Sequence, residues 1–105
     1  MSARFRFTKS AAKDLIQIAN YISDEDPTAA ERVVDDIASA IENLIRFPEM
    51  GRIREDLADR RHRVWPVGRH LIFYRPETKP PQIVRILDPA RGARARMPLR
   101  SAEAY

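Results

Sequence analysis

The sequence predicts an α+β domain in which an antiparallel pair of helices packs on one face of a twisted, mainly antiparallel sheet. Apolar residues recur every three or four positions across residues 11–22 and 27–46, which is the spacing of an amphipathic helix. Apolar and polar residues then alternate in three short stretches between residues 61 and 87, the pattern of strands joined by turns. A short alternation at residues 4–8 completes the order strand, two helices, three strands.

The length of 105 residues fits a single domain with one core. We expect residues 89–105 to form a weakly anchored tail, because they include few large apolar side chains. The chain has no cysteine, which excludes disulfides and thiolate metal sites. It also lacks an apolar stretch long enough for a signal peptide or a membrane span, so we expect a cytoplasmic protein with no membrane contact.

The two helices have recognisable starts and ends. Thr8 or Ser10 can cap the first helix, and Asp26 followed by Pro27 is a typical start for the second. Pro48 ends the second helix. Only about four residues separate the two, so we expect an antiparallel hairpin. The apolar stripes expected to face the sheet are Ala12, Leu15, Ile16, Ala19 and Ile22 in the first helix, widened by Ile18 and Tyr21, and Ala30, Val33, Val34, Ile37, Ala38, Ile41, Leu44 and Ile45 in the second.

The three later strands are predicted at residues 61–66, 69–75 and 82–87, after a polar connector over residues 48–59. Apolar residues fall on both faces of these strands, so we expect the face away from the helices to be covered too, by the tail or by a partner. By strict alternation, the faces of the last two strands are Leu71 and Phe73 against His70, Ile72 and Tyr74, and Val84 and Ile86 against Ile83, Arg85 and Leu87.

Charge is distributed unevenly along the chain. Residues 1–50 carry six Lys and Arg against nine Asp and Glu, a net charge of −3, whereas residues 51–105 carry thirteen against six, a net charge of +7. A one-sided positive charge is typical of proteins that bind nucleic acid or an acidic partner. A solvated arginine-rich surface is the alternative interpretation.

Two histidines are candidates for acid–base chemistry. His62 and His70 fall on neighbouring predicted strands and could pair with Tyr74 or with an acid for proton transfer. The alternative is that both are exposed strand residues without a chemical role. Two histidines without cysteines or clustered acids are too few for a metal site, and the chain has neither a dinucleotide-binding glycine motif nor a P-loop. We therefore expect no metal and no cofactor.

Arginines are the other candidates, because the guanidinium group binds phosphate or carboxylate with two hydrogen bonds and is always charged. On the sheet they could hold an RNA or DNA backbone while bases stack on aromatic residues, or they could receive an acidic peptide. The residues alone leave both possibilities open. The candidates are Arg52, Arg54, Arg60, Arg61, Arg63, Arg69, Arg75, Arg85 and Arg91.

The sheet region GRHLIFYRPETKPPQIVRIL, residues 68–87, resembles the ParE branch of the RelE/ParE toxins of bacterial type II toxin–antitoxin systems. The matching positions are the Phe-Tyr-Arg that ends one strand at residues 73–75 and the Ile-Val-Arg-Ile-Leu of the next at residues 83–87. The first helix, AAKDLIQIANYI, also matches, as does Pro48 two residues before Met50. The resemblance implies the same α+β fold and a cytoplasmic toxin bound by a cognate antitoxin from the same operon.

The resemblance leaves two modes of action. ParE-like members poison DNA gyrase without chemistry of their own, whereas RelE-like members are metal-independent endoribonucleases that cleave mRNA on the ribosome. Arg91 is similar in position to a functional arginine of the ribonuclease branch, but Met97 stands where that branch has a tyrosine. This favours gyrase as the target. The chain also departs from the ParE pattern at Asp88, where a histidine is usual, and at residues 89–92.

Site residues follow for each mode of action. A gyrase poison would bind its target through Arg69, His70, Tyr74, Arg85 and Arg91. A ribonuclease would use Arg61, His62, Arg85 and Arg91 to bind phosphate and transfer protons. A third possibility is a non-toxic chain that only binds the antitoxin as a co-repressor, with contact to operator DNA only through the antitoxin. We expect the antitoxin on the outer faces of the helical hairpin and on the edge strands.

Overall fold

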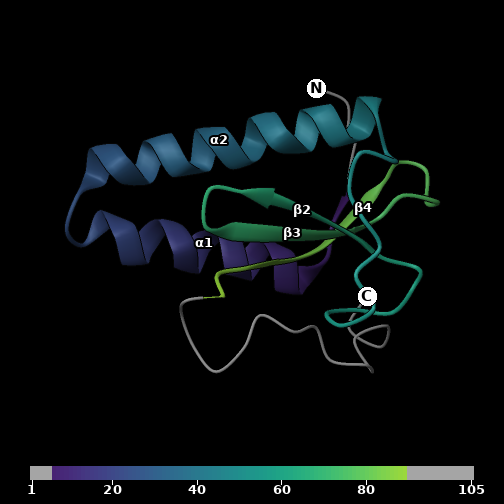
Figure 1. The fold of residues 1–105 in the computed structure, drawn as a ribbon. Coiled ribbons are helices and arrows are strands. Elements are labelled where there is room, and N and C mark those ends of the chain that lie inside the picture. The colour runs from purple at the N-terminus through teal and green to yellow at the C-terminus, as the bar shows by residue number, and fades with distance from the viewer. Residues whose placement is uncertain (1–5, 90–105) are drawn as a thin grey trace.

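A computed structural model describes residues 6–89 of the chain and confirms the predicted fold class (Figure 1). The sheet has the strand order β1-β4-β3-β2, in which β1 runs parallel to β4 and the other neighbours are antiparallel. The two helices lie antiparallel to each other on one side of the sheet. The elements are β1 (Arg6–Phe7), α1 (Lys9–Ser23), α2 (Pro27–Arg46), β2 (Arg63–Val67), β3 (His70–Arg75) and β4 (Gln82–Leu87).

Side-chain caps set the starts of both helices. The Thr8 hydroxyl accepts a hydrogen bond from the backbone nitrogen of Ala11 at 3.0 Å, so Thr8 caps α1, and not Ser10. The Asp26 carboxylate accepts from Ala29 at 3.1 Å, and Pro27 is the first residue of α2, as predicted. The predicted stripes are wrong at Ile16, Tyr21 and Ala38, which are exposed.

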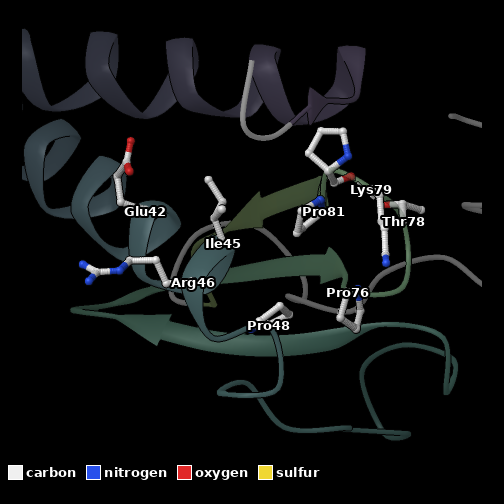
Figure 2. Close-up of a pocket in the computed structure, with 9 residues that line it drawn as sticks. Glu42, Ile45, Arg46, Pro48, Pro76, Thr78, Lys79 and Pro81 are labelled. Atoms are coloured by element: carbon white, nitrogen blue, oxygen red, sulfur yellow. Dashed lines mark hydrogen bonds between the residues drawn. The ribbon is translucent and has the colours of Figure 1, made fainter. Parts of the chain in front are cut away.

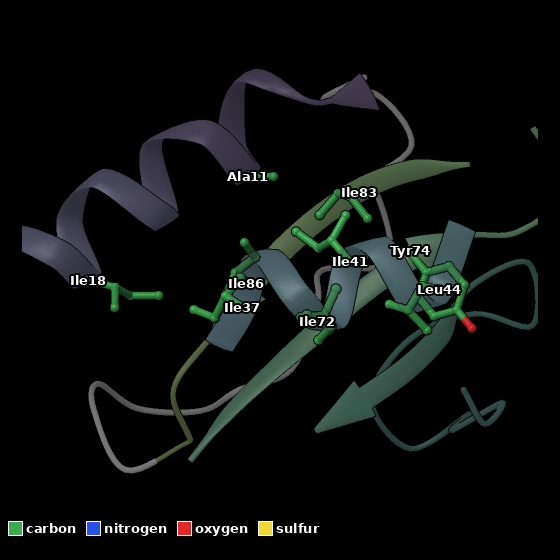
Figure 3. Packing of buried hydrophobic residues seen from close by; sticks show 10 residues of the cluster. Ala11, Ile18, Ile37, Ile41, Leu44, Ile72, Tyr74, Ile83 and Ile86 are labelled. Atoms are coloured by element: carbon green, nitrogen blue, oxygen red, sulfur yellow. The ribbon is translucent and has the colours of Figure 1, made fainter. Parts of the chain in front are cut away.

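The main core lies between the helical hairpin and the sheet (Figure 3). Its helical side comes from residues spaced three or four apart, which is what brings them to one face. Its sheet side comes from alternate residues of β3 and from β4. The buried members are Ala11 and Ile18 of α1, Ile37, Ala40, Ile41 and Leu44 of α2, Ile72 and Tyr74 of β3, and Ile83 and Ile86 of β4.

A second apolar cluster covers the opposite face of the sheet. Leu57 and Ala58 of the connector pack there against Phe73 of β3 and Val84 of β4. A covered second face was predicted, but within residues 6–89 the cover is the connector itself. The observed connector covers residues 47–62. Because it turns back at its end, β2 begins at Arg63, two residues later than predicted.

Strict alternation along β4 is wrong because of a bulge. The register pairs Tyr74 with Ile83 and Phe73 with Arg85, which leaves Val84 as the extra residue. Ile83 and Ile86 therefore both belong to the main core, whereas Val84 belongs to the second cluster. Within residues 6–89, no helix is long and apolar enough to cross a membrane.

Candidate functional site

The structure separates the sequence-predicted site residues into four places. Arg61 and His62 lie together at the end of the connector, and Arg69 and His70 lie together where β3 begins. Tyr74 is in the main core and Arg85 is bound to α1. The remaining candidate, at position 91, lies outside the described residues.

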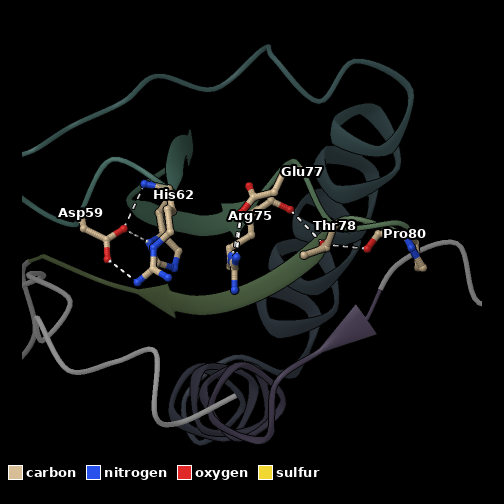
Figure 4. Close-up of polar contacts among 7 residues, drawn as sticks. Asp59, His62, Arg75, Glu77, Thr78 and Pro80 are labelled. Carbon is tan, nitrogen blue, oxygen red and sulfur yellow. Dashed lines mark hydrogen bonds and ion pairs between the residues drawn. The ribbon is translucent and has the colours of Figure 1, made fainter.

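His62 is fully buried and its Nδ1 atom lies 2.8 Å from Oδ1 of Asp59 (Figure 4). Arg61 binds the other oxygen of the same carboxylate at 3.1 Å. Burial lowers the pKa of His62 below its ordinary value of 6.5, against the opposite effect of Asp59. Burial also opposes ionisation of Asp59, but hydrogen bonds from Arg61 and His62 outweigh it and lower the pKa of Asp59. His62 is thus an internal group whose burial disfavours the charged imidazolium form.

His70 is also buried, with 4% of its surface exposed. The interpretation of His62 and His70 as two exposed strand residues is therefore wrong. His62 lies before β2 and contacts Asp59, whereas His70 alternates along β3 with the core residues Ile72 and Tyr74. Next to His70, the exposed side chain of Arg69 lies 3.3 Å from the carboxylate of Asp88, whose own side chain is only 6% exposed. Asp88, the departure from the ParE pattern, therefore has a cationic partner at the end of β4.

Arg85 makes a bidentate ion pair with Asp14 of α1. Its Nε and Nη2 atoms lie 2.7 Å and 3.0 Å from the two carboxylate oxygens. Asp14 also accepts a hydrogen bond from the backbone nitrogen of Ile86 at 3.0 Å. The hydrogen bond to Asp14 raises the pKa of Arg85. Because β1 has only two residues, it does not reach the end of the β4 edge. There, Asp14 of α1 supplies the hydrogen-bond acceptor for the backbone nitrogen of Ile86.

The Tyr74 hydroxyl is bound to the backbone of the connector. It donates to the carbonyl of Pro48 at 2.6 Å and accepts from the nitrogen of Gly51 at 2.9 Å. Burial raises the pKa of Tyr74. The Tyr74 hydroxyl, a predicted partner for the histidines, is thus bound to the connector instead. The acid that contacts His62 is Asp59.

Several arginines of the basic half are bound to acidic side chains or to backbone carbonyls. Arg75 binds Glu77 at 2.7 Å (Figure 4), and Arg63 donates to the carbonyls of Glu49 and Gly51. Two more pairs, Arg54 with Asp56 and Arg60 with Glu55, lie on the connector. The positive charge of this half is thus partly neutralised. Within residues 6–89, no three His, Cys, Asp or Glu side chains gather in a way that could hold a metal ion.

A groove of about 850 Å³ lies between the end of α2 and the turn from β3 to β4 (Figure 2). Sequence reasoning missed it, because its two walls are some thirty residues apart in the chain. The cluster of prolines in the 76–81 turn was the one available signal. We call it the proline groove; its lining is Glu42, Ile45, Arg46, Pro48, Pro76, Thr78, Lys79, Pro80 and Pro81.

Comparison with known proteins assigns the family. The family model described as "ParE toxin of type II toxin-antitoxin system, parDE" matches residues 5–93. The chain belongs to the ParE toxin family. This confirms the resemblance in the sheet and the first helix, and the ParE match extends over both helices and all four strands.

Two relatives support the assignment. A solved structure, "Chromosomal ParDE TA system from P. aeruginosa", superposes with a TM-score of 0.68 at 25% identity, over 80% of this chain and 92% of that one. "Putative toxin Y4kP" of Sinorhizobium fredii (strain NBRC 101917 / NGR234) is 43% identical over 49 residues. That match spans 47% of this chain and about half, 51%, of the relative.

Proposed function

We propose that this ParE-family chain is a toxin that inhibits DNA gyrase in the cytoplasm and is neutralised by a cognate antitoxin from the same operon. The observation that carries the proposal is the ParE family match across residues 5–93, together with the likeness to a ParDE toxin–antitoxin system. In this proposal the toxin has no chemistry of its own and needs no cofactor. It reaches operator DNA only through the antitoxin.

The placement of the ribonuclease candidates supports gyrase over mRNA as the target. A ribonuclease of this size would need its cations and its acid–base group to converge on one phosphate. Here Arg85 is bound to Asp14, and the buried His62 is bound to Asp59. The sequence also has Met97 where the ribonuclease branch has a tyrosine.

The deciding experiment is controlled expression of the chain without its antitoxin. Gyrase poisoning predicts filamentation, a DNA-damage response and gyrase-linked DNA breaks while translation continues. The purified chain should then inhibit supercoiling by gyrase. Rapid loss of translation with cleaved transcripts would instead favour the endoribonuclease. Normal growth would favour the third possibility, a non-toxic co-repressor that only binds the antitoxin.

A further inference from the structure

We propose that the proline groove binds an extended segment of the antitoxin in which a large apolar residue lies next to an acidic one. The inference rests on the proposed function, which supplies the antitoxin as partner. It assigns that partner to a place in the fold that differs from the outer face of the hairpin and from the strand edges.

The strand edges offer little room for an added strand. On the outer edge of β2, both backbone groups of Val64 are bonded to Arg52, at 3.0 Å and 2.7 Å, and Pro66 has no N–H to donate. On the β4 side, the Thr8 hydroxyl binds the carbonyl of Val84 and Asp14 binds the nitrogen of Ile86. A partner segment beside β2, or beside the part of β4 that β1 does not cover, would therefore be held mainly by side chains.

The lining of the proline groove can be buried by a partner at a low cost in desolvation free energy. Four of its nine lining residues are prolines, which have no amide hydrogen that a partner would leave unpaired. The hydroxyl of Thr78 already bonds the carbonyls of Pro80, at 2.8 Å, and Arg75, at 3.2 Å. With Ile45 on the helical wall, the groove suits a large aliphatic or aromatic side chain (Figure 2).

Charge and exposure at the rim point to a macromolecular partner with a carboxylate. Arg46 ends the helical wall and Lys79 lies in the turn opposite, against the single acid Glu42. Between Arg46 and Pro48 stands Phe47, which is 59% exposed and has the Arg46 guanidinium 6.0 Å from its ring centre. Exposed aromatic residues beside arginine are typical of protein interfaces.

A charge-reversal pair tests the proposal. In Arg46→Glu/Lys79→Glu, affinity for the purified antitoxin should fall at least about tenfold, and the loss should shrink as salt is raised. The matched control, Lys13→Glu/Arg32→Glu, makes the same change in charge at exposed positions of the hairpin and should lose less than about twofold. Equal affinities for the groove pair and the unchanged chain would overturn the proposal. Loss confined to the control pair would do so as well, and would place the antitoxin on the hairpin.

A second readout locates the partner directly. Because the chain has no cysteine, Lys79→Cys introduces its only thiol. Bound antitoxin should slow maleimide labelling of this thiol at least about tenfold and leave the same thiol in Lys13→Cys unaffected. Equal labelling rates with and without antitoxin would overturn the proposal, as would protection that depends only on the concentration of the toxin, which would indicate a second copy of the chain.

The two proposals can fail separately. Gyrase inhibition by the groove variants is measured without antitoxin and should equal that of the unchanged chain. Suppose that the unchanged chain and the groove variants all fail to inhibit gyrase, while the charge-reversal pair still binds the antitoxin more weakly. Gyrase would then be the wrong target, and the assignment of the antitoxin to the proline groove would stand.

Discussion

The hydroxyl of Tyr74 accepts a hydrogen bond from the backbone nitrogen of Gly51 at 2.9 Å and so links β3 to the start of the connector. The approach is close, because a Cβ atom at Gly51 would lie 2.7 Å from that hydroxyl oxygen. The same hydroxyl donates to the carbonyl of Pro48. One side chain of the core therefore determines where the chain runs after α2.

Removing the hydroxyl should destabilise the fold. Tyr74→Phe keeps the buried ring but leaves the amide of Gly51 and the carbonyl of Pro48 without their partner, which costs ~1–3 kcal/mol of unfolding free energy. Urea denaturation measures the loss. Tyr21→Phe, at a residue that is 58% exposed, is the control and should change stability by less than about 0.5 kcal/mol. Equal stability of Tyr74→Phe and the unchanged chain would show that these bonds contribute nothing.

The Asp14–Arg85 pair should be structural. Asp14→Ala leaves a partly buried guanidinium and the amide of Ile86 unpaired, so we expect a loss of ~2–4 kcal/mol in urea denaturation. Asp14→Ala/Arg85→Ala should lose less than the sum of the two single changes. The exposed pair of Arg60 and Glu55 is the control, and Arg60→Ala should cause no measurable change. Additive losses would contradict a direct interaction.

Stability should fall in mild acid because of His62. Its folded-state pKa is lowered by burial, so the unfolded chain takes up a proton first as the pH falls through 6.5. The free energy of unfolding should decrease from there down to the lower folded-state pKa, then level off. The lowered pKa values of Asp59 and Glu77 act separately, since their contribution is lost only as the pH falls below their ordinary values of 3.8 and 4.5. Urea titrations at several pH values should show that His62→Gln loses the slope below pH 6.5 and keeps the more acidic one. An unchanged slope would assign it to another group.

The turn between β2 and β3 should require glycine for its backbone angle alone. Gly68 has φ of +58°, and a Cβ atom there would meet nothing within 4 Å. Gly68→Ala should therefore cost ~1–2 kcal/mol from the left-handed conformation, measured by thermal unfolding. Gly68→Asn should cost less, because asparagine tolerates that conformation better. Equal losses for both variants would point to a different cause.

Arg91 remains a prediction from the sequence, since it lies outside the described residues. If it contacts the target, Arg91→Ala should reduce toxicity in cells that lack the antitoxin, measured as colony formation after induction. Arg60→Ala, an exposed arginine on the connector, is the control and should remain toxic. Full toxicity of Arg91→Ala would exclude that contact.

The order of elements, the α+β fold class and the ParE family can all be predicted from the amino-acid sequence alone. These follow from local periodicity, from caps such as Asp26 with Pro27, and from short motifs in the sheet, all of which can be read from neighbouring residues. The placement of the charged and polar side chains could not be read in this way. Arg85 and Asp14 are 71 positions apart, and only packing of α1 against β4 brings them together.

The face of the sheet on which each strand residue lies also depends on tertiary packing. The bulge at Val84 breaks strict alternation, and His62 is fully buried although its sequence pattern also allowed an exposed residue. The proline groove exists only because the end of α2 comes to lie beside the turn that follows β3. Periodicity reports a local preference for burial, but which groups meet is determined by packing between segments far apart in the chain.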